Sequence, residues 1–225
     1  MKTTLVLILS LAILAAGCAS SGGAADGKRG MTNTEKGAII GAVGGAVVGA
    51  AVSDNRGKGA LIGAVGGGLA GGAVGAYMDS QKQDLEKSLK KERDAGNARV
   101  EKLPGDVVKI TMTNQTAFDT GSSAIKAGFR PTMDRLAEVV TRYGKTSLTV
   151  VGHTDAEGSK EYNQELSRKR AQAVVDYFRS KNVHPQRLEA VGKGESEPVS
   201  SNKSESGRQA NRRVEIFVEP VRAES

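Results

Sequence analysis

The sequence predicts an α+β protein: a mixed sheet with helices on one face, in the order β-α-β-α-β-β, behind a helical hairpin rich in glycine. Two observations carry this prediction. Most of the 29 glycines lie in residues 22–75, where two stretches have glycine at every fourth position. From Arg99 onward, short β-branched runs alternate with amphipathic stretches of helical period. Residues 99–225 are therefore expected to form a separate domain, long enough to bury its own core.

The composition excludes several classes of function. The formal net charge of +7 divides into +3 for residues 1–98 and +4 for residues 99–225, with no block of basic residues. Nucleic acid is therefore not an expected partner. One cysteine and two histidines exclude a disulfide framework and offer too few ligands for a His/Cys metal site. No metal and no other cofactor is expected.

The N-terminus predicts export and lipidation. A short cationic start is followed by an apolar run, residues 5–16, which is too short to span a bilayer comfortably. Cys18 follows directly, and this arrangement resembles the signal of bacterial lipoproteins, in which the cysteine is lipidated and the chain is cut before it. Residues 1–17 are thus the expected signal peptide, with an ordinary secretory signal as the alternative. No Asp stands at position 19 to resemble an inner-membrane retention signal, so the resemblance implies the outer membrane. Residues 18–33, rich in Ser, Gly and Ala, are expected to be a flexible tether.

A repeated glycine pattern follows the tether. Residues 37–52 and 59–74 are copies displaced by 22 positions and identical at 11 of 16. Glycine at every fourth position forms one stripe on a helix, which is favourable only where another backbone packs closely against it. Residues 34–76 are therefore predicted to form an antiparallel helical hairpin that can self-associate. Each arm of ~24 Å, at ~1.5 Å per residue, is shorter than a hydrocarbon core of ~30 Å. Membrane insertion and a soluble self-associating hairpin both stay open.

Residues 77–98 form a charged stretch after the hairpin. Met78, Leu85 and Leu89 recur at helical spacing, and Glu86 precedes an oppositely charged residue by four positions. The pattern predicts a solvated spacer helix that continues the second arm.

The elements of the C-terminal domain are predicted from period and turn residues. The turn Pro104-Gly105-Asp106 separates two strands of a hairpin, and a proline opens the first amphipathic helix. The expected strands are residues 100–103, 107–112, 147–152, 187–191 and 213–218, and the expected helices are residues 131–143 and 159–181.

Four motifs in this domain resemble the OmpA-like C-terminal domain family, which includes the peptidoglycan-associated lipoproteins. The motifs are Phe118-Asp119, Gly152-His153-Thr154-Asp155, Asn163-x-x-Leu166-Ser167-x-x-Arg170-Ala171-x-x-Val174 and Asn211-Arg212-Arg213-Val214. They follow one another at the family's spacing over about 105 residues, from Ala117 to Val221. The resemblance implies non-covalent binding of the cell wall, with the diaminopimelate of the wall peptide as ligand. It departs from the family at Gly121, where a polar residue is frequent.

The motif residues can converge physically. Asn163, Ser167 and Arg170 lie on one face of the predicted long helix, and Asp155 ends the preceding strand. The free end of diaminopimelate carries an ammonium and a carboxylate on one carbon, which one carboxylate and one guanidinium can bind together. The resemblance implies that Asp155 takes the ammonium and Arg170 the carboxylate. The same resemblance implies supporting contacts from Thr154, Asn163 and Arg212, with Asp119 at the rim.

Other roles for these residues compete with binding. Asp155 and Arg170 could form a structural ion pair, which could coexist with binding, and Ser167 could be a hydroxyl on the helix surface. Arg213 is expected to be a surface charge at the start of a strand. His153, Ser167 and Asp155 do not predict a catalytic triad, because no nucleophile elbow is present.

The function expected from these features is a non-enzymatic tether between outer membrane and peptidoglycan. The C-terminal domain would lie in the periplasm and the lipid anchor at Cys18 in the outer membrane. The alternative is a membrane-associated, oligomerising protein whose glycine hairpin is the functional element and whose wall domain only localises it. A wall hydrolase is not expected, because neither a metal site nor a positioned nucleophile and base is evident.

Overall fold

The computed structural model describes residues 73–222. The predicted signal peptide, the tether with Cys18 and nearly all of the glycine hairpin lie outside the described residues. The longer described elements are α3 (Ala73–Ser88), α4 (Lys90–Asp94), β1 (Ala98–Leu103), β2 (Val107–Thr113), α5 (Asn114–Ala117), α6 (Arg130–Arg142), β3 (Thr146–Gly152), α7 (Lys160–Ser180), β4 (Leu188–Gly192), α8 (Glu205–Asn211) and β5 (Arg213–Pro220).

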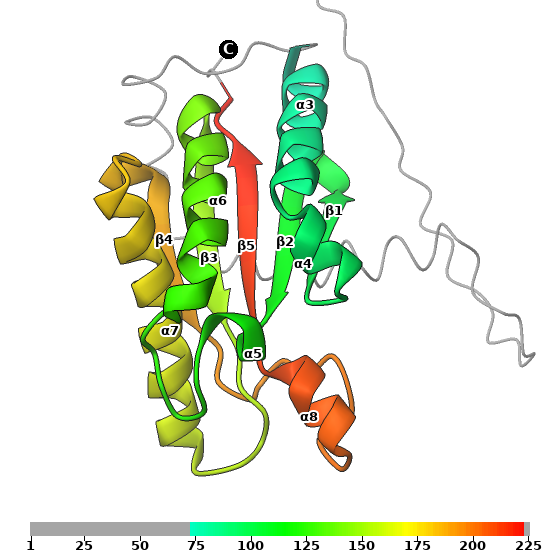
Figure 1. Ribbon diagram of the computed structural model, residues 1–225, viewed down its shortest axis with the longest axis vertical. Coiled ribbons are helices and arrows are strands. Elements are labelled where there is room, and N and C mark those ends of the chain that lie inside the picture. Colours follow the sequence, from blue (N-terminus) through cyan, green and yellow to red (C-terminus); the bar gives the residue numbers. More distant parts are fainter. Residues whose placement is uncertain (1–72, 223–225) are drawn as a thin grey trace, which may run out of the picture.

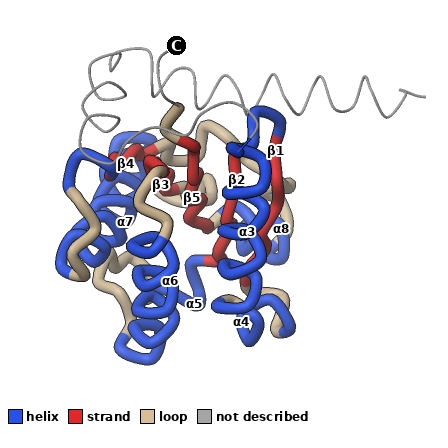
Figure 2. Tube along the Cα trace, turned by 90° about the horizontal axis from the view of Figure 1, so that it is seen from above, coloured by secondary structure: helices blue, strands red, loops and turns tan. Residues whose placement is uncertain are grey.

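One five-stranded sheet organises the domain. Its strand order is β1-β2-β5-β3-β4, so the last strand of the chain inserts at the centre. β3 and β4 pair in parallel, and the other neighbours pair antiparallel, which confirms the predicted mixed sheet. The helices α3, α6 and α7 cover one face of this sheet (Figures 1 and 2). This agrees with the predicted packing of helices on one face.

The core lies between the sheet and these three helices. Strand side chains alternate between faces, so every second residue of the central strands enters the core. Each fully buried apolar side chain of this kind contributes about 1.5–3 kcal/mol. The central core residues are Val108, Ile110 and Met112 of β2, Val214, Ile216 and Val218 of β5, Met133, Leu136 and Val140 of α6, and Val174 and Phe178 of α7.

Local sequence signals explain where the two predicted helices begin. α6 has Pro131 in its first turn, where the missing N–H costs no hydrogen bond. Ser159 caps α7, since its Oγ accepts a hydrogen bond from the N–H of Tyr162 at 3.1 Å. Both helices have the predicted extents to within one residue at each end.

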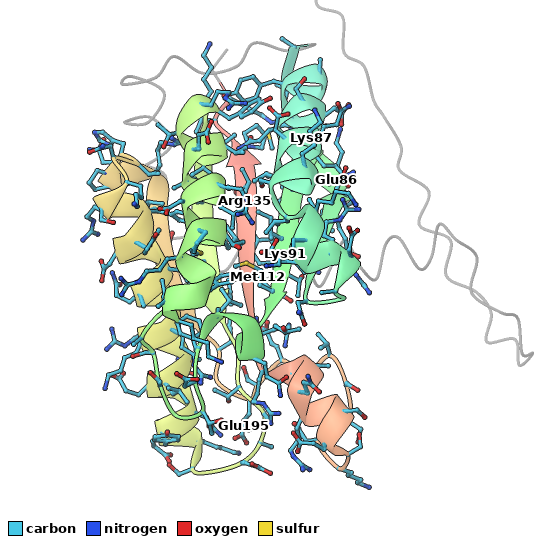
Figure 3. The ribbon with its side chains drawn as sticks, viewed as in Figure 1. Glu86, Lys87, Lys91, Met112, Arg135 and Glu195 are labelled. Atoms are coloured by element: carbon cyan, nitrogen blue, oxygen red, sulfur yellow. The ribbon has the colours of Figure 1, made fainter. Side chains whose placement is uncertain are left out.

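The prediction of a solvated spacer after the hairpin is wrong for α3. Met78, Leu85 and Leu89 are fully buried against α6, β1 and β2 as part of the same core. Arg135 of α6 reaches across to this segment (Figure 3) and donates from Nε to the carbonyl of Ser88 at 2.9 Å. The helical period of the three apolar residues is correct, but it does not reveal what that face packs against. α3 is the third helix of the domain.

α8 is a helix that the sequence does not predict. It lies between β4 and β5, with the Oγ of Ser204 accepting a hydrogen bond from the N–H of Gly207. A Cβ at Gly207 would lie 2.0 Å from the carbonyl oxygen of Ser201, so only glycine fits this close approach.

Within residues 73–222, no helix is both long enough and apolar enough to cross a membrane.

Candidate functional site

A pocket of about 410 Å³ opens where β3 ends and α7 begins. Figure 1 shows this end of the molecule, at which α5, α8 and the first turns of α7 meet. Five residues predicted from the motifs line the pocket together: Thr154, Asp155, Asn163, Arg170 and Arg212. Gln115, Thr120, Gly121, Glu157, Tyr162, Leu166 and Glu205 complete the lining. A second hollow of about 560 Å³ lies between α6 and the end of α7, and none of the predicted residues lines it.

Asp155 pairs with Arg212, and not with Arg170. Its Oδ2 lies 2.5 Å from Nη1 of Arg212, and its Oδ1 accepts a hydrogen bond from the N–H of Glu157 at 3.1 Å. The carboxylate is 9% exposed. The structural ion pair considered for Asp155 therefore exists, but with a different arginine. The reason is that Arg170 is held by other groups.

Arg170 is buried and fixed by backbone carbonyls. Its Nε donates to the carbonyl of Ser122 at 2.9 Å, and its Nη2 donates to the carbonyl of Asp119 at 3.3 Å. The guanidinium also stands 5.6 Å from the ring centroid of Phe118, a cation–π distance. Burial lowers the pKa of Arg170, and the phenol of Tyr162 and the carboxylate of Asp155 act against this effect. The result is a buried cation with no described carboxylate partner in direct contact.

Asp119 takes part in the site through its backbone. Its side chain is mostly exposed and lies 3.1 Å from the ammonium of Lys126, and Asp119 is not among the residues that line the pocket. Its carbonyl accepts from Arg170, as described above. The structure therefore places Asp119 behind Arg170, and its carboxylate does not line the pocket.

Thr154 and Asn163 offer polar groups of two kinds. The N–H of Thr154 donates to the carbonyl of Gly194 at 2.8 Å, while its Oγ1 is buried with no hydrogen-bond partner among residues 73–222. Asn163 donates from Nδ2 to Glu195 at 2.7 Å; Figure 3 labels this glutamate at the pocket end. A buried hydroxyl without a hydrogen-bond partner costs free energy, so Oγ1 of Thr154 is suited to a hydrogen bond with a ligand.

Ser167, for which a surface hydroxyl is one alternative, and Arg213, which is expected at the surface, are both buried. Ser167 donates to the carbonyl of Gln164 at 2.8 Å and accepts from the N–H of Gly194 at 2.9 Å, which ties α7 to the loop after β4. Arg213 is buried and its Nε lies 2.8 Å from Oε1 of Glu215. Arg213 begins the central strand β5, and its Nη2 also donates to the carbonyl of Glu197, in the segment between β4 and α8, at 3.2 Å. The surface interpretations of both residues are wrong.

His153 does not form a catalytic triad. Its ring nitrogens have no hydrogen-bond partner in the described part of the chain, and its Nε2 lies 3.8 Å from Glu215 on the neighbouring strand. Burial, reinforced by the charges of Arg213, Lys193 and Lys109, lowers the pKa of His153 to about 3. The imidazole is therefore neutral and structural.

Five lining residues lie outside the predicted motifs: Gln115, Thr120, Glu157, Tyr162 and Glu205. Tyr162 is 52% exposed. Its position directly before the motif residue Asn163 on α7 is the sequence signal that could have placed it at the pocket. A Cβ at Gly121 would lie 3.5 Å from the Tyr162 hydroxyl, and Gly121 has a φ of +68° that favours glycine. Glu157 and Glu205 carry no local pattern; Glu205 reaches the pocket because α8 folds against the loop that follows β3.

No cluster of metal-ligating side chains occurs in residues 73–222. The charged groups of the pocket are instead one nearly buried carboxylate, two guanidinium groups and two more exposed carboxylates. This set is suited to a ligand that carries both a positive and a negative group.

Comparisons with known proteins agree with the motifs. Residues 117–212 match the OmpA family, and residues 1–79 match the YMGG-like Gly-zipper family. The probable lipoprotein YiaD of Escherichia coli is 34% identical over 148 residues, or 66% of this chain and 65% of its own. The peptidoglycan-associated lipoprotein of Rhizobium meliloti is 34% identical over 91 residues, or 40% of this chain and 52% of its own.

Solved structures share the fold. The structure titled as the cell wall anchor of the T6SS from Pseudomonas aeruginosa has a TM-score of 0.56 and 31% identity, covering 60% of this chain and 96% of that chain. A putative MotB-like protein from Desulfovibrio vulgaris has a TM-score of 0.58 at 23% identity, covering 66% of this chain and 94% of that chain, and shows the fold alone. The chain spans less than two thirds of the length of the two lipoproteins it matches above.

Proposed function

Because the C-terminal part of this chain is an OmpA-like domain, we propose that the protein is a non-enzymatic lipoprotein that binds peptidoglycan and ties the outer membrane to the wall. One observation carries the proposal: a single pocket unites the nearly buried carboxylate of Asp155 with the guanidinium groups of Arg170 and Arg212. Related chains named as lipoproteins, one of them as peptidoglycan-associated, support it.

The proposed ligand is the free end of diaminopimelate in the wall peptide. Asp155 receives its ammonium, and Arg170 donates to its carboxylate from the inner wall of the pocket. The unpaired Oγ1 of Thr154 and the side-chain amide of Asn163 supply further contacts, with Arg212 beside them. A zwitterion satisfies these groups together, whereas a simple cation or a simple anion satisfies half of them.

A titration with matched wall peptides tests this ligand. The peptides differ in one residue, diaminopimelate or lysine, and the lysine peptide lacks the terminal carboxylate. We expect the diaminopimelate peptide to bind more tightly, and calorimetry measures the difference. Equal affinities of the two peptides would exclude the site, and absence of binding to isolated sacculi would exclude the function.

The N-terminal part of the chain determines where in the cell the protein acts. Lipidation of Cys18 anchors the chain in the outer membrane, with residues 18–33 as tether and the OmpA-like domain in the periplasm. Several buried acyl chains make such anchoring stable, since each CH₂ contributes roughly 0.8 kcal/mol.

The glycine hairpin supports a second candidate function, self-association at or in the membrane. The four-residue register of glycine over residues 37–75 and the match to a Gly-zipper family favour it. Gly45→Leu should separate packed backbones and reduce cross-linked oligomers, while Ala42→Leu, off the stripe, should be milder. Identical cross-linking of the two variants would exclude the zipper as the contact.

A further inference from the structure

A ring of alternating charges runs from Asp155, in the loop after β3, to α8 and back to Glu157 in the same loop. Asp155 lies 2.5 Å from Arg212, Arg212 lies 2.7 Å from Glu205, and Glu205 lies 2.5 Å from Arg208. Arg208 then lies 3.0 Å from Glu157, which is two residues after the starting Asp155. The ring thus begins and ends in the loop after β3; α8 supplies Glu205 and Arg208, and Arg212 is the residue that follows this helix.

The ring blocks the position that the ligand needs. Both oxygens of Asp155 already accept, one from Arg212 and one from the backbone of Glu157. An ammonium that approaches Asp155 also meets the positive charge of Arg212. If Asp155 were the only carboxylate partner of Arg212, its displacement by a ligand would be costly, because the partly buried guanidinium would remain unpaired.

Arg212 has a second carboxylate partner, which lowers the free-energy cost of its displacement from Asp155. Its Nη2 donates to Oε1 of Glu205 while its Nη1 donates to Asp155. Exposure rises along the series, from 9% for the side chain of Asp155 through 22% for Arg212 to 63% for Glu205. Arg212 can therefore release Asp155 and stay paired with Glu205 at the outer, better solvated end.

We propose that Arg212 is an exchangeable counter-ion of Asp155 and that Glu205 is the positioning residue that holds Arg212 during the exchange. This inference rests on the proposed function. The ligand ammonium replaces Nη1 of Arg212 at Asp155, and the released Nη1 donates to the ligand carboxylate beside Arg170. The released Nη1 of Arg212 and the guanidinium of Arg170 gain an acceptor only when the ligand brings a carboxylate as well as an ammonium.

The exchange explains selectivity as well as affinity. A ligand with an ammonium alone takes Asp155 but gives the released Nη1 no acceptor. A ligand with a carboxylate alone leaves Arg212 on Asp155. Arg212 thus acts as a repulsive element against simple cations, a device by which a site rejects the wrong partner.

A double-mutant cycle tests the roles of Glu205 and Arg212. The full mature chain in detergent is titrated calorimetrically with the diaminopimelate peptide and with the lysine peptide. Glu205→Gln should weaken the diaminopimelate peptide about three- to fivefold, the scale of one half-exposed ion pair. Glu205→Asp should restore part of this loss. Arg212→Gln should reduce the preference for the diaminopimelate peptide, and Glu205→Gln should then have no further effect in that background.

The control is Glu138→Gln, which removes a glutamate paired with Arg142 at 2.9 Å on α6, away from the pocket lining. It should bind as the unmodified chain does.

The inference is overturned if Glu205→Gln binds normally, or if its effect persists in the Arg212→Gln background, since Glu205 would then act through the stability of α8. Circular-dichroism melting separates unfolding from a change at the site. If the unmodified chain does not prefer the diaminopimelate peptide, the proposed function fails and the exchange fails with it.

Discussion

Arg170 is in position before any ligand arrives. Carbonyls of Ser122 and Asp119 hold two of its nitrogens, and the ring of Phe118 covers one side of the guanidinium. Little side-chain entropy remains to be lost on binding, which favours affinity. The planar group can bond two carbonyls and still present a donor to the pocket, a geometry that an ammonium cannot copy.

Substitution of Arg170 should therefore reduce binding strongly. Arg170→Ala should cost about 2–4 kcal/mol of binding free energy, which is roughly 30- to 1000-fold in affinity. Arg170→Lys should restore binding only in part. Calorimetry with the diaminopimelate peptide measures both variants. Arg168→Ala is the control, since Arg168 is exposed on α7 and paired with Glu165. A folded Arg170→Ala chain that binds normally would contradict the role of this arginine.

His153 gives the domain a dependence on pH. Arg213 and Glu215 of β5, Lys109 of β2 and Lys193 of the loop after β4 surround it. Its pKa is about 3 in the folded chain, against an ordinary value of 6.5. Between these values the unfolded chain binds a proton that the folded chain excludes. The contribution of neutral His153 is therefore complete above pH 6.5 and is lost as the pH falls.

The variant His153→Gln isolates this contribution. Its stability relative to the unmodified chain should change by about 1.4 kcal/mol between pH 7.5 and 5.5, measured by urea unfolding. The comparison is needed because burial, with the charge of Glu189, raises the pKa of Glu219 to about 7. Glu219 contributes most at low pH and so acts in the opposite direction. A free-energy difference that is constant over this range would contradict the burial of His153, and His184→Gln serves as the exposed control.

At the scale of elements, α3 belongs to the same folded domain as the five-stranded sheet. Its apolar face fills the space between α6 and β1, and the rings of Tyr77 and Tyr143 meet edge to face at 5.3 Å. Polar contacts reinforce this packing, for example the hydroxyl of Tyr143 on Asp84 at 2.9 Å. The unit that folds by itself therefore includes α3, and a boundary at Arg99 would expose the core.

Loss of α3 should destabilise the domain. A fragment of residues 73–225 should unfold cooperatively, whereas a fragment of residues 99–225 should be much less stable in urea. Leu85→Ala in the longer fragment should cost about 2–5 kcal/mol, because it leaves a cavity in the core. Lys87→Ala, on the exposed side of α3 (Figure 3), should be nearly neutral. Equal stability of the two fragments would show that α3 is dispensable.

At the scale of the whole molecule, the chain enters the domain far from the pocket. α3 begins beside the turn between β1 and β2, whereas α5, α8 and the pocket lie at the other end of the sheet (Figure 1). β5 runs from Arg213, next to the pocket residue Arg212, to Pro220 at the entry end. An anchor upstream of α3 therefore leaves the pocket facing away from the attachment point, which suits a link between two layers.

Anchoring by lipid should be separable from anchoring by the wall. Cys18→Ser should give an uncleaved or soluble periplasmic chain that still sediments with sacculi. After the sacculi are digested, it should leave the membrane fraction, while the unmodified chain stays there. Immunoblots of the fractions measure this. Retention of the variant with the outer membrane after digestion would show that Cys18 is not the main anchor.

The sequence determined the local elements and five of the residues that line the pocket. Apolar period placed α6, α7 and the strands, Ser159 marked the start of α7, and the spacing of Asn163 and Arg170 put them on one face. These signals are local, because helix and strand periods act over a few residues. Sequence patterns of this kind do not reveal what a face packs against, which is why α3 was expected in solvent.

Only the tertiary structure decided which charges meet. Asp155 and Arg212 are 57 residues apart and adjacent in space, and Glu205 joins them because α8 folds against the loop after β3. Arg212 and Arg213 are neighbours in sequence, yet one lines the pocket and the other is buried on the sheet. Arg212 is the residue that follows α8 and reaches Asp155, whereas Arg213 begins β5 and pairs with Glu215, two residues further along the same face of that strand. The partner of each arginine therefore depends on which carboxylate the assembled fold brings within reach.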